Sequence, residues 1–305
     1  MSRVRTAYRL LLLSGAIATT THAALPELIV FGAVGRAPGT QIYTVAPDGQ
    51  TVTQVTQGVL GVSRWPDWSP DGSRIVYSGA VAGVDGIYVI SRDGAEVDRI
   101  SANGSDSQTA WSPDGSQILF RRGVGRFDSR MHVMSTDGQD SVSLTDGPAG
   151  EDSPAWHPSG RSVVFRDIVG ETLGTLDVSE GTRRVIRVDG REPAWSPDGR
   201  RTAAVVRRDI HTMDGDGGGL SRLTIHPARD SAPAWSPDGG SLVFASQRDD
   251  TQQLYRIDAD GGNVRRLVSS PSSDFEPAWW GPGKLAVTAR ERQSTMWGWL
   301  RRHTP

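Results

Sequence analysis

Short runs of apolar residues, separated by polar turn residues, recur along most of the chain. A typical stretch has Ala234 and Trp235, then the turn Ser236-Pro237-Asp238-Gly239, then the apolar triplet 242–244. Short runs rich in β-branched and aromatic residues, bounded by Gly, Pro, Asp and Ser, are typical of β-strands. The high Gly content of 36 residues and the 18 prolines suit many strands joined by tight turns. The pattern therefore predicts an all-β protein.

The Trp-containing motif recurs six times, at intervals of 39 to 45 residues. Its tryptophans are Trp68, Trp111, Trp156, Trp195, Trp235 and Trp279. Each repeat can supply four strands: one that ends in the Trp, an apolar second strand, a third that ends in an Asp-Gly turn, and a fourth. A radial repeat of about 40 residues with four strands is typical of a β-propeller blade. We expect the six tryptophans to pack between neighbouring blades.

The two ends of the repeat region predict how the ring closes. Residues 28–31, 41–46 and 51–55 have the pattern of second, third and fourth strands, with no first strand before them. The repeat around Trp279 would supply that first strand, which closes a six-bladed ring and hides both sheet edges. Residues Leu285 to Thr288 also have the pattern of a second strand. Seven blades, two of them incomplete, therefore remain the alternative.

The first 23 residues have the features of a Sec-type signal peptide. Arg3, Arg5 and Arg9 precede an apolar run, and Thr21-His22-Ala23 is a cleavage site with small residues at both ends. We expect residues 1–23 to be removed, residues 24–290 to form a single propeller domain, and residues 291–305 to be a tail. The chain has no Cys, so neither a lipoprotein anchor nor a disulfide is expected. The predicted location is periplasmic or secreted, without membrane insertion.

Acidic residues are concentrated just before the repeat tryptophans. Removal of the signal peptide's three arginines takes the formal charge from -2 to -5, so no bulk positive field points to nucleic acid. The five residues before each Trp should border the mouth of the central channel. These windows contain eight acids against Arg64 and Arg191. The acids are Asp67, Asp106, Glu151, Asp152, Glu192, Asp230, Asp274 and Glu276.

Two interpretations of this acidic channel mouth stay open. A narrow opening of one charge sign focuses the electric field and favours a cationic peptide, or a bound cation such as calcium. The carboxylates could equally be exposed to solvent or paired with arginines such as Arg229. Asp67 stands out further, because the other five repeats have Ala at its position, and a carboxylate there needs a partner. No cofactor is expected.

Catalytic motifs are sparse. The nucleophile elbow Gly-x-Ser-x-Gly of serine hydrolases does not occur in the sequence. His132 and His211 occupy a repeat position that is Tyr in other repeats, so we expect both to be structural strand residues. The sequence favours a protein that is not an enzyme, and a carbohydrate-active lyase or a hydrolase is the alternative.

The repeated Ala-Trp-Ser-Pro-Asp-Gly motif resembles the TolB-like β-propeller repeat family. The resemblance covers nearly the whole chain after residue 23, but the α/β domain that precedes the propeller of TolB is not expected here. Propellers of prolyl oligopeptidases and oligogalacturonate lyases have the same repeat type. The resemblance implies a protein- or peptide-binding module of the cell envelope, which we expect to be a monomer.

Overall fold

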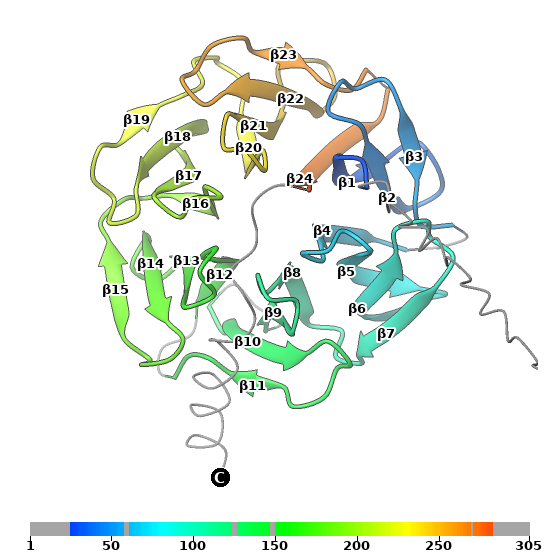
Figure 1. The fold of residues 1–305 in the computed structure, drawn as a ribbon, viewed down its shortest axis with the longest axis horizontal. Helices are drawn as coiled ribbons and strands as arrows, with labels where there is room; N and C mark the ends of the chain where they lie inside the picture. The colour runs from blue at the N-terminus through cyan, green and yellow to red at the C-terminus, as the bar shows by residue number, and fades with distance from the viewer. Residues whose placement is uncertain (1–24, 58–60, 124–126, 147–149, 270, 283–305) are drawn as a thin grey trace, which may run out of the picture.

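The protein is a six-bladed β-propeller (Figure 1). The structure, a computed structural model, describes residues 25–57, 61–123, 127–146, 150–269 and 271–282. These residues form six antiparallel sheets of four strands each, arranged in a ring. The predicted fold is therefore confirmed. Residues Leu285 to Thr288, which raised the seven-blade alternative, lie outside the described residues. Within the described ranges, no helix is long and apolar enough to cross a membrane.

Each blade runs outward from a first strand at the ring centre to a fourth strand at the rim. Blade 1 consists of β24 (Ser273–Trp280), β1 (Leu28–Val34), β2 (Thr40–Val45) and β3 (Val52–Gln54). Blade 2 consists of β4 (Ser63–Trp68), β5 (Arg74–Val81), β6 (Val84–Ser91) and β7 (Val97–Ser101), and blade 3 of β8 (Asp106–Trp111), β9 (Gln117–Arg122), β10 (Arg130–Ser135) and β11 (Val142–Ser143). Blade 4 consists of β12 (Glu151–Trp156), β13 (Ser162–Asp167), β14 (Thr172–Asp177) and β15 (Arg183–Ile186), and blade 5 of β16 (Arg191–Trp195), β17 (Arg201–Val206), β18 (Asp209–Asp214) and β19 (Ser221–Arg222). Blade 6 consists of β20 (Asp230–Trp235), β21 (Ser241–Ser246), β22 (Gln253–Asp258) and β23 (Arg265–Arg266).

The two ends of the described chain meet in blade 1. Strand β24 pairs antiparallel with β1, with Trp279 opposite Ile29 and Trp280 opposite Leu28. Figure 1 shows the orange β24 beside the blue β1. This confirms the prediction that the last repeat supplies the first strand of an incomplete blade. The pairing covers the edge that each segment would otherwise expose.

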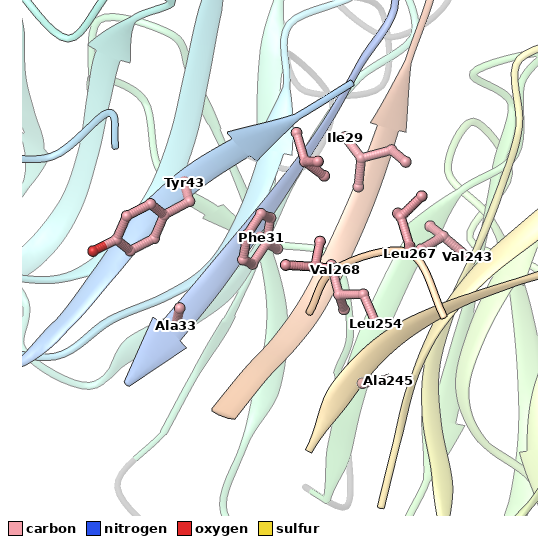
Figure 2. Close-up of a cluster of buried hydrophobic side chains, with 10 residues drawn as sticks. Ile29, Phe31, Ala33, Tyr43, Val243, Ala245, Leu254, Leu267 and Val268 are labelled. Carbon is pink, nitrogen blue, oxygen red and sulfur yellow. The ribbon is translucent and has the colours of Figure 1, made fainter. Parts of the chain in front are cut away.

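The hydrophobic core is divided among the six interfaces between neighbouring blades. Figure 2 shows the interface of blades 6 and 1, where Val243 and Leu254 pack against Ile29 and Phe31. Each repeat Trp belongs to the cluster between its own blade and the preceding one. Four of the six are at most 7% exposed, and the other two are partly buried. The prediction that these tryptophans pack between blades is therefore confirmed.

The Ser-Pro-Asp-Gly segments form tight turns between the first and second strands. In blade 2, the Gly72 N–H donates to the Ser69 carbonyl at 2.8 Å, and the Ser69 hydroxyl donates to the Asp71 carboxylate at 2.6 Å. Gly72 has a φ of 69°, and a Cβ there would lie 2.3 Å from the Trp280 ring. Glycine is therefore required for both the backbone conformation and the close packing.

Candidate functional site

A β-bulge interrupts the innermost strand of every blade at the same place. In β4, for example, the register with β5 shifts between Arg64 and Asp67. The residue three positions before the repeat Trp has φ between 48° and 55° in all six blades. These six bulge residues are Trp65, Gln108, Ser153, Glu192, Ala232 and Glu276. None is glycine, and a non-glycine residue held in this region costs about 1–3 kcal/mol.

The bulge residues line the wall of a central cavity. All six belong to the lining of a cavity of about 620 Å³ on the ring axis. The lining continues to the turn prolines Pro70, Pro113, Pro158, Pro197 and Pro237, so the cavity extends toward the face that carries these turns. Bulges commonly redirect a side chain, and here they direct one residue per blade toward the axis.

Bulge side chains on alternate blades connect neighbouring blades. Glu276 Oε2 accepts a hydrogen bond from the Trp65 N–H at 2.8 Å, and Gln108 Oε1 accepts one from the Ser153 N–H at 2.8 Å. Glu192 Oε2 accepts the third, from the bulge N–H of the next blade, at 2.6 Å. The polar side chains of blades 1, 3 and 5 thus bond the bulge amides of blades 2, 4 and 6. This arrangement gives the cavity approximate threefold character and fixes the carboxylates.

One of the cavity carboxylates, Glu276, pairs with the partly exposed Arg64. Arg64 Nε lies 3.4 Å from Glu276 Oε1, and its guanidinium lies over the rings of Trp65 and Phe275. The pKa of Glu276 is raised to about 7, chiefly by burial and also by the negative charge of Glu192. The Arg64 charge and the hydrogen bond from the Trp65 N–H act in the opposite direction. Glu276 therefore changes its charge near neutral pH.

Asp67 is the third carboxylate of the cavity lining. Its Oδ2 atom accepts a hydrogen bond from the Trp111 N–H of the next blade at 2.8 Å. Burial raises the pKa of Asp67 to about 7, against the lowering effect of bonds from the Trp111 and Trp68 amides. The partner that the sequence required for this carboxylate is thus the backbone of the neighbouring blade.

Four of the eight predicted site carboxylates are buried inside the blades and do not line the cavity. They are Asp106, Glu151, Asp230 and Asp274, whose side chains are at most 2% exposed. Each forms an ion pair with an arginine: Arg122, Arg183, Arg248 and Arg36, in the same order. This corrects the expectation that they border the channel mouth, and the arginines that pair with them do not include Arg229.

These four ion pairs share a common geometry. In blade 3, Arg122 bonds both carboxylate oxygens of Asp106, at 2.7 and 2.8 Å, and its guanidinium lies 5.1 Å from the Phe120 ring centre. The other three arginines lie over a Phe of their own blade in the same way. The carboxylate is therefore part of the blade's internal structure. One sequence feature could have identified the pairing arginines of blades 1, 3 and 6. In these blades the Phe of the second strand is followed within five residues by the Arg that forms the ion pair.

Asp152 forms a weaker contact. It is half-buried, lies 3.9 Å from Arg166, and is absent from the cavity lining. The structure thus gathers three of the eight predicted residues in the cavity, namely Asp67, Glu192 and Glu276, and separates them from the other five. Sequence reasoning missed Gln108, which is neutral but has the same structural role as the two glutamates.

The described histidines are distributed over different positions in the ring. His132 stacks on Phe120 within blade 3, and burial lowers its pKa to about 4. His211 lies opposite Ala204 in the strand pairing of blade 5. Both therefore occupy strand positions, as expected from the Tyr that replaces them in other repeats. Within the described residues, no group of three or more His, Asp or Glu side chains is arranged to hold a metal ion.

Comparison with known proteins agrees with this architecture. The TolB beta propeller domain family matches residues 28–191 and 177–299. A search of curated proteins found no match. TolB from Acinetobacter baumannii superposes with a TM-score of 0.75 at 21% identity, over 83% of this chain and 66% of that one. This chain thus spans just under two thirds of that protein.

Further solved structures share the fold. The putative TolB from Agrobacterium tumefaciens superposes with a TM-score of 0.64 at 20% identity, over 83% of this chain and 98% of that one. An oligogalacturonate lyase in complex with manganese has a TM-score of 0.52 at 16% identity, over 82% and 74%. At these identities the likeness establishes the fold alone. Because the family model covers nearly all of the described chain, the protein belongs to the TolB β-propeller domain family.

Proposed function

We propose that the protein is a non-enzymatic binding module that receives a basic, aromatic segment of a partner protein in its central cavity. We further propose that it acts in the periplasm or outside the cell, after removal of residues 1–23. Residues 24–290 are then the binding domain and residues 291–305 a tail. Membership of the TolB propeller family supports a protein-binding role and an envelope location.

The observation that carries this proposal is the composition of the cavity wall. Three carboxylates, Asp67, Glu192 and Glu276, face a cavity that contains one arginine, Arg64. Arg64 is already paired with Glu276, whereas no ion pair to Glu192 occurs among the described residues, and one Glu192 oxygen accepts a hydrogen bond from a backbone amide. A concave site with more carboxylates than basic side chains attracts cations and speeds their association.

The remaining wall is apolar and rigid. Ten of the chain's 18 prolines line the cavity, together with the six repeat tryptophans and Trp280. Proline has no N–H to donate, so the proline rings of this wall offer apolar surface rather than hydrogen-bond donors. The volume of about 620 Å³ lies within the range of small-ligand pockets. It is therefore suited to one or two side chains of an inserted segment, such as Arg beside Trp, and not to a folded domain.

A display library of short random peptides, selected against the protein, tests the proposal. Selected peptides should combine Arg or Lys with an aromatic residue. They should bind at least tenfold more weakly when Glu192 and Glu276 are both replaced by Gln, which keeps the acceptors for the neighbouring amides but removes the charge. The matched control is Glu96→Gln with Asp98→Asn, which removes two charges from exposed residues at the outer edge of blade 2. Equal binding by both double variants would refute the proposal.

A further inference from the structure

Exposed arginines gather on the face of the ring opposite the turn prolines. The first strand of each blade begins on this face and the second strand returns to it, so the start of β16, the β17–β18 hairpin and the connections before β16 and β20 all lie here. These segments contain a single exposed acid, Asp189. Their exposed basic residues, which form the arginine patch, are Arg187, Arg191, Arg207, Arg208 and Arg229.

Backbone contacts bring the members of the arginine patch together across blade 5. Arg191 lies opposite Val205 in the β16–β17 pairing, one residue before the end of β17. The Arg208 carbonyl accepts a hydrogen bond from the Asp230 N–H at 2.8 Å, which places Arg229 beside the hairpin. The patch therefore runs from the connection with blade 4 to the connection with blade 6.

The carboxylates next to the arginine patch do not neutralise it. Asp209 follows the hairpin directly but is paired with Arg222 at 3.0 Å, and Asp230 is paired with Arg248 at 3.2 Å. No arginine of the patch forms an ion pair with any residue that the structure describes. Because a guanidinium group is always charged at neutral pH and carries five N–H donors, the patch is a positive surface suited to carboxylates.

The hairpin between β17 and β18 holds two arginines in the left-handed region. Arg207 has a φ of 52° and Arg208 a φ of 83°. The hairpin of blade 2 has the same length, and Ala82 and Gly83 there have φ of 52° and 78°. Two-residue turns of this kind favour Asn-Gly, because a side chain at positive φ crowds the backbone. The protein therefore accepts an unfavourable backbone conformation where the hairpin presents two cations.

An apolar side chain borders the arginine patch. Ile225 is 80% exposed, the highest value among the large hydrophobic residues that the structure describes as exposed. The hydroxyl of its neighbour Thr224 accepts a hydrogen bond from the N–H of Ile210, two residues after Arg208, at 2.9 Å. The surface thus combines cations with an exposed aliphatic side chain, and arginine is enriched in protein interfaces.

Acidic residues surround the arginine patch on the same face. Glu171 in the hairpin of blade 4, Asp250 in the β21–β22 connection and Asp85 at the hairpin of blade 2 are exposed. A planar anionic membrane would meet these carboxylates together with the patch, whereas a short acidic segment can contact blade 5 alone. The charge distribution therefore favours a protein segment over a membrane.

We propose that the arginine patch is a second interaction surface, which binds an acidic segment of a partner protein with Asp or Glu on both sides of an aliphatic residue. The patch shares no residue with the cavity lining and lies on the other side of the ring from the turn prolines. Both surfaces can therefore be occupied at once, and the inference does not depend on the proposed function of the cavity.

Replacement of the hairpin by its favoured turn sequence tests the proposal. Arg207→Asn/Arg208→Gly removes two charges and relieves the unfavourable φ, so the melting temperature should stay equal or rise while binding is lost. A display library of short random peptides, selected on the Glu192→Gln/Glu276→Gln protein, should yield peptides rich in Asp and Glu. These peptides should bind at least tenfold more weakly when the hairpin is also replaced.

A matched control removes the same charge from the other face. Arg161→Gln/Arg200→Gln replaces two exposed arginines that follow the turns of blades 4 and 5, and it should leave binding of the acidic peptides unchanged. Equal binding by the hairpin and control variants would overturn the proposal, as would selected peptides without an acidic excess. Vesicles of phosphatidylcholine and phosphatidylglycerol test the membrane alternative. If the hairpin replacement abolishes vesicle binding and acidic peptides do not bind, the patch contacts a lipid surface and the proposal is overturned.

The two surfaces are distinguished by their own variants. If acidic peptides bind through the arginine patch but basic peptides do not respond to Glu192→Gln/Glu276→Gln, this inference stands and the proposed function fails. If the reverse holds, the cavity binds its partner and the arginine patch is ordinary surface.

Discussion

Replacement of Asp67 by Asn should stabilise the protein at alkaline pH. The Asp67 carboxylate occupies a slot that is Ala in the other five repeats, and burial raises its pKa from 3.8 to about 7. Between these values the folded state binds a proton that the unfolded state does not bind. Stability from this group is therefore present in full below about pH 4 and is lost as pH rises through 7. A shift of about three units at 1.36 kcal/mol each corresponds to at most about 4 kcal/mol.

The Asn side chain has the shape of the carboxyl group and keeps one acceptor oxygen. Its amide oxygen can accept the hydrogen bond from the Trp111 N–H, which measures 2.8 Å in the parent protein. Asp67→Asn should thus equal the parent protein near pH 4.5 and exceed its stability by a few kcal/mol at pH 8. Asp67→Ala is the informative comparison, because it removes the charge and also leaves the Trp111 amide without an acceptor, at a cost of about 1–3 kcal/mol.

Urea unfolding from pH 4.5 to 8 measures these differences. The parent protein should lose stability relative to Asp67→Asn as pH rises. The difference in free energy of unfolding between Asp67→Asn and Asp67→Ala should stay constant with pH. Asp67→Asn could instead be less stable than the parent protein at pH 8, with free energies of unfolding that change equally with pH in both proteins. In that case the carboxylate is a stabilising ionised group. Burial of the Asp67 charge would then not destabilise the folded protein.

Four further outcomes follow from the structure. Trp111→Ala, which empties the interface of blades 2 and 3, should cost about 3–5 kcal/mol in urea unfolding, and a loss below about 1 kcal/mol would contradict the inter-blade packing. Asp106→Asn should cost about 1–3 kcal/mol because both oxygens of the buried carboxylate accept hydrogen bonds from Arg122, whereas the exposed control Asp98→Asn should cost less than about 0.5 kcal/mol; equal costs would show that the Asp106 pair is not structural. Truncation before Ala278 removes the residues opposite Leu28, Ile29 and Val30, so the product should aggregate or lose cooperative unfolding, and a soluble, cooperative product would refute ring closure. Binding of a basic peptide should weaken as pH falls from 8 to 6, because Asp67 and Glu276 take up protons around pH 7; calorimetric titration that shows no pH dependence would exclude a role for these two carboxylates.

The architecture could be predicted from sequence because each repeat carries its own local signals. Tryptophan at a fixed spacing identifies the inter-blade interfaces, and Ser-Pro-Asp-Gly identifies the turn through residue types with specific backbone preferences. The missing first strand before Leu28 and the unmatched first strand at Trp279 together predicted ring closure. All of these signals lie within a few residues of the feature that they specify.

The candidate site could be predicted only in part, because its geometry depends on the bulge. In a regular strand, Asp274 and Glu276 would face the same side, since they are two positions apart. The bulge changes this relation, so Glu276 faces the cavity and Asp274 lies under Arg36. No glycine marks the bulge position in any repeat. The Arg36–Asp274 pair was also hidden from sequence, because these residues are 238 positions apart and meet only when the ring closes.

The salt dependence of peptide binding to the cavity tests whether the cavity carboxylates bind the partner. For a basic, aromatic peptide selected on the parent protein, the Kd should rise steeply between 0.05 and 0.5 M NaCl, because the Debye length falls across this range. Glu192→Gln/Glu276→Gln should bind at least tenfold more weakly at low salt, with a much flatter salt response, while Glu96→Gln/Asp98→Asn should match the parent protein. If the Glu192/Glu276 variant shows the parent's Kd and salt response, the cavity carboxylates do not bind the partner.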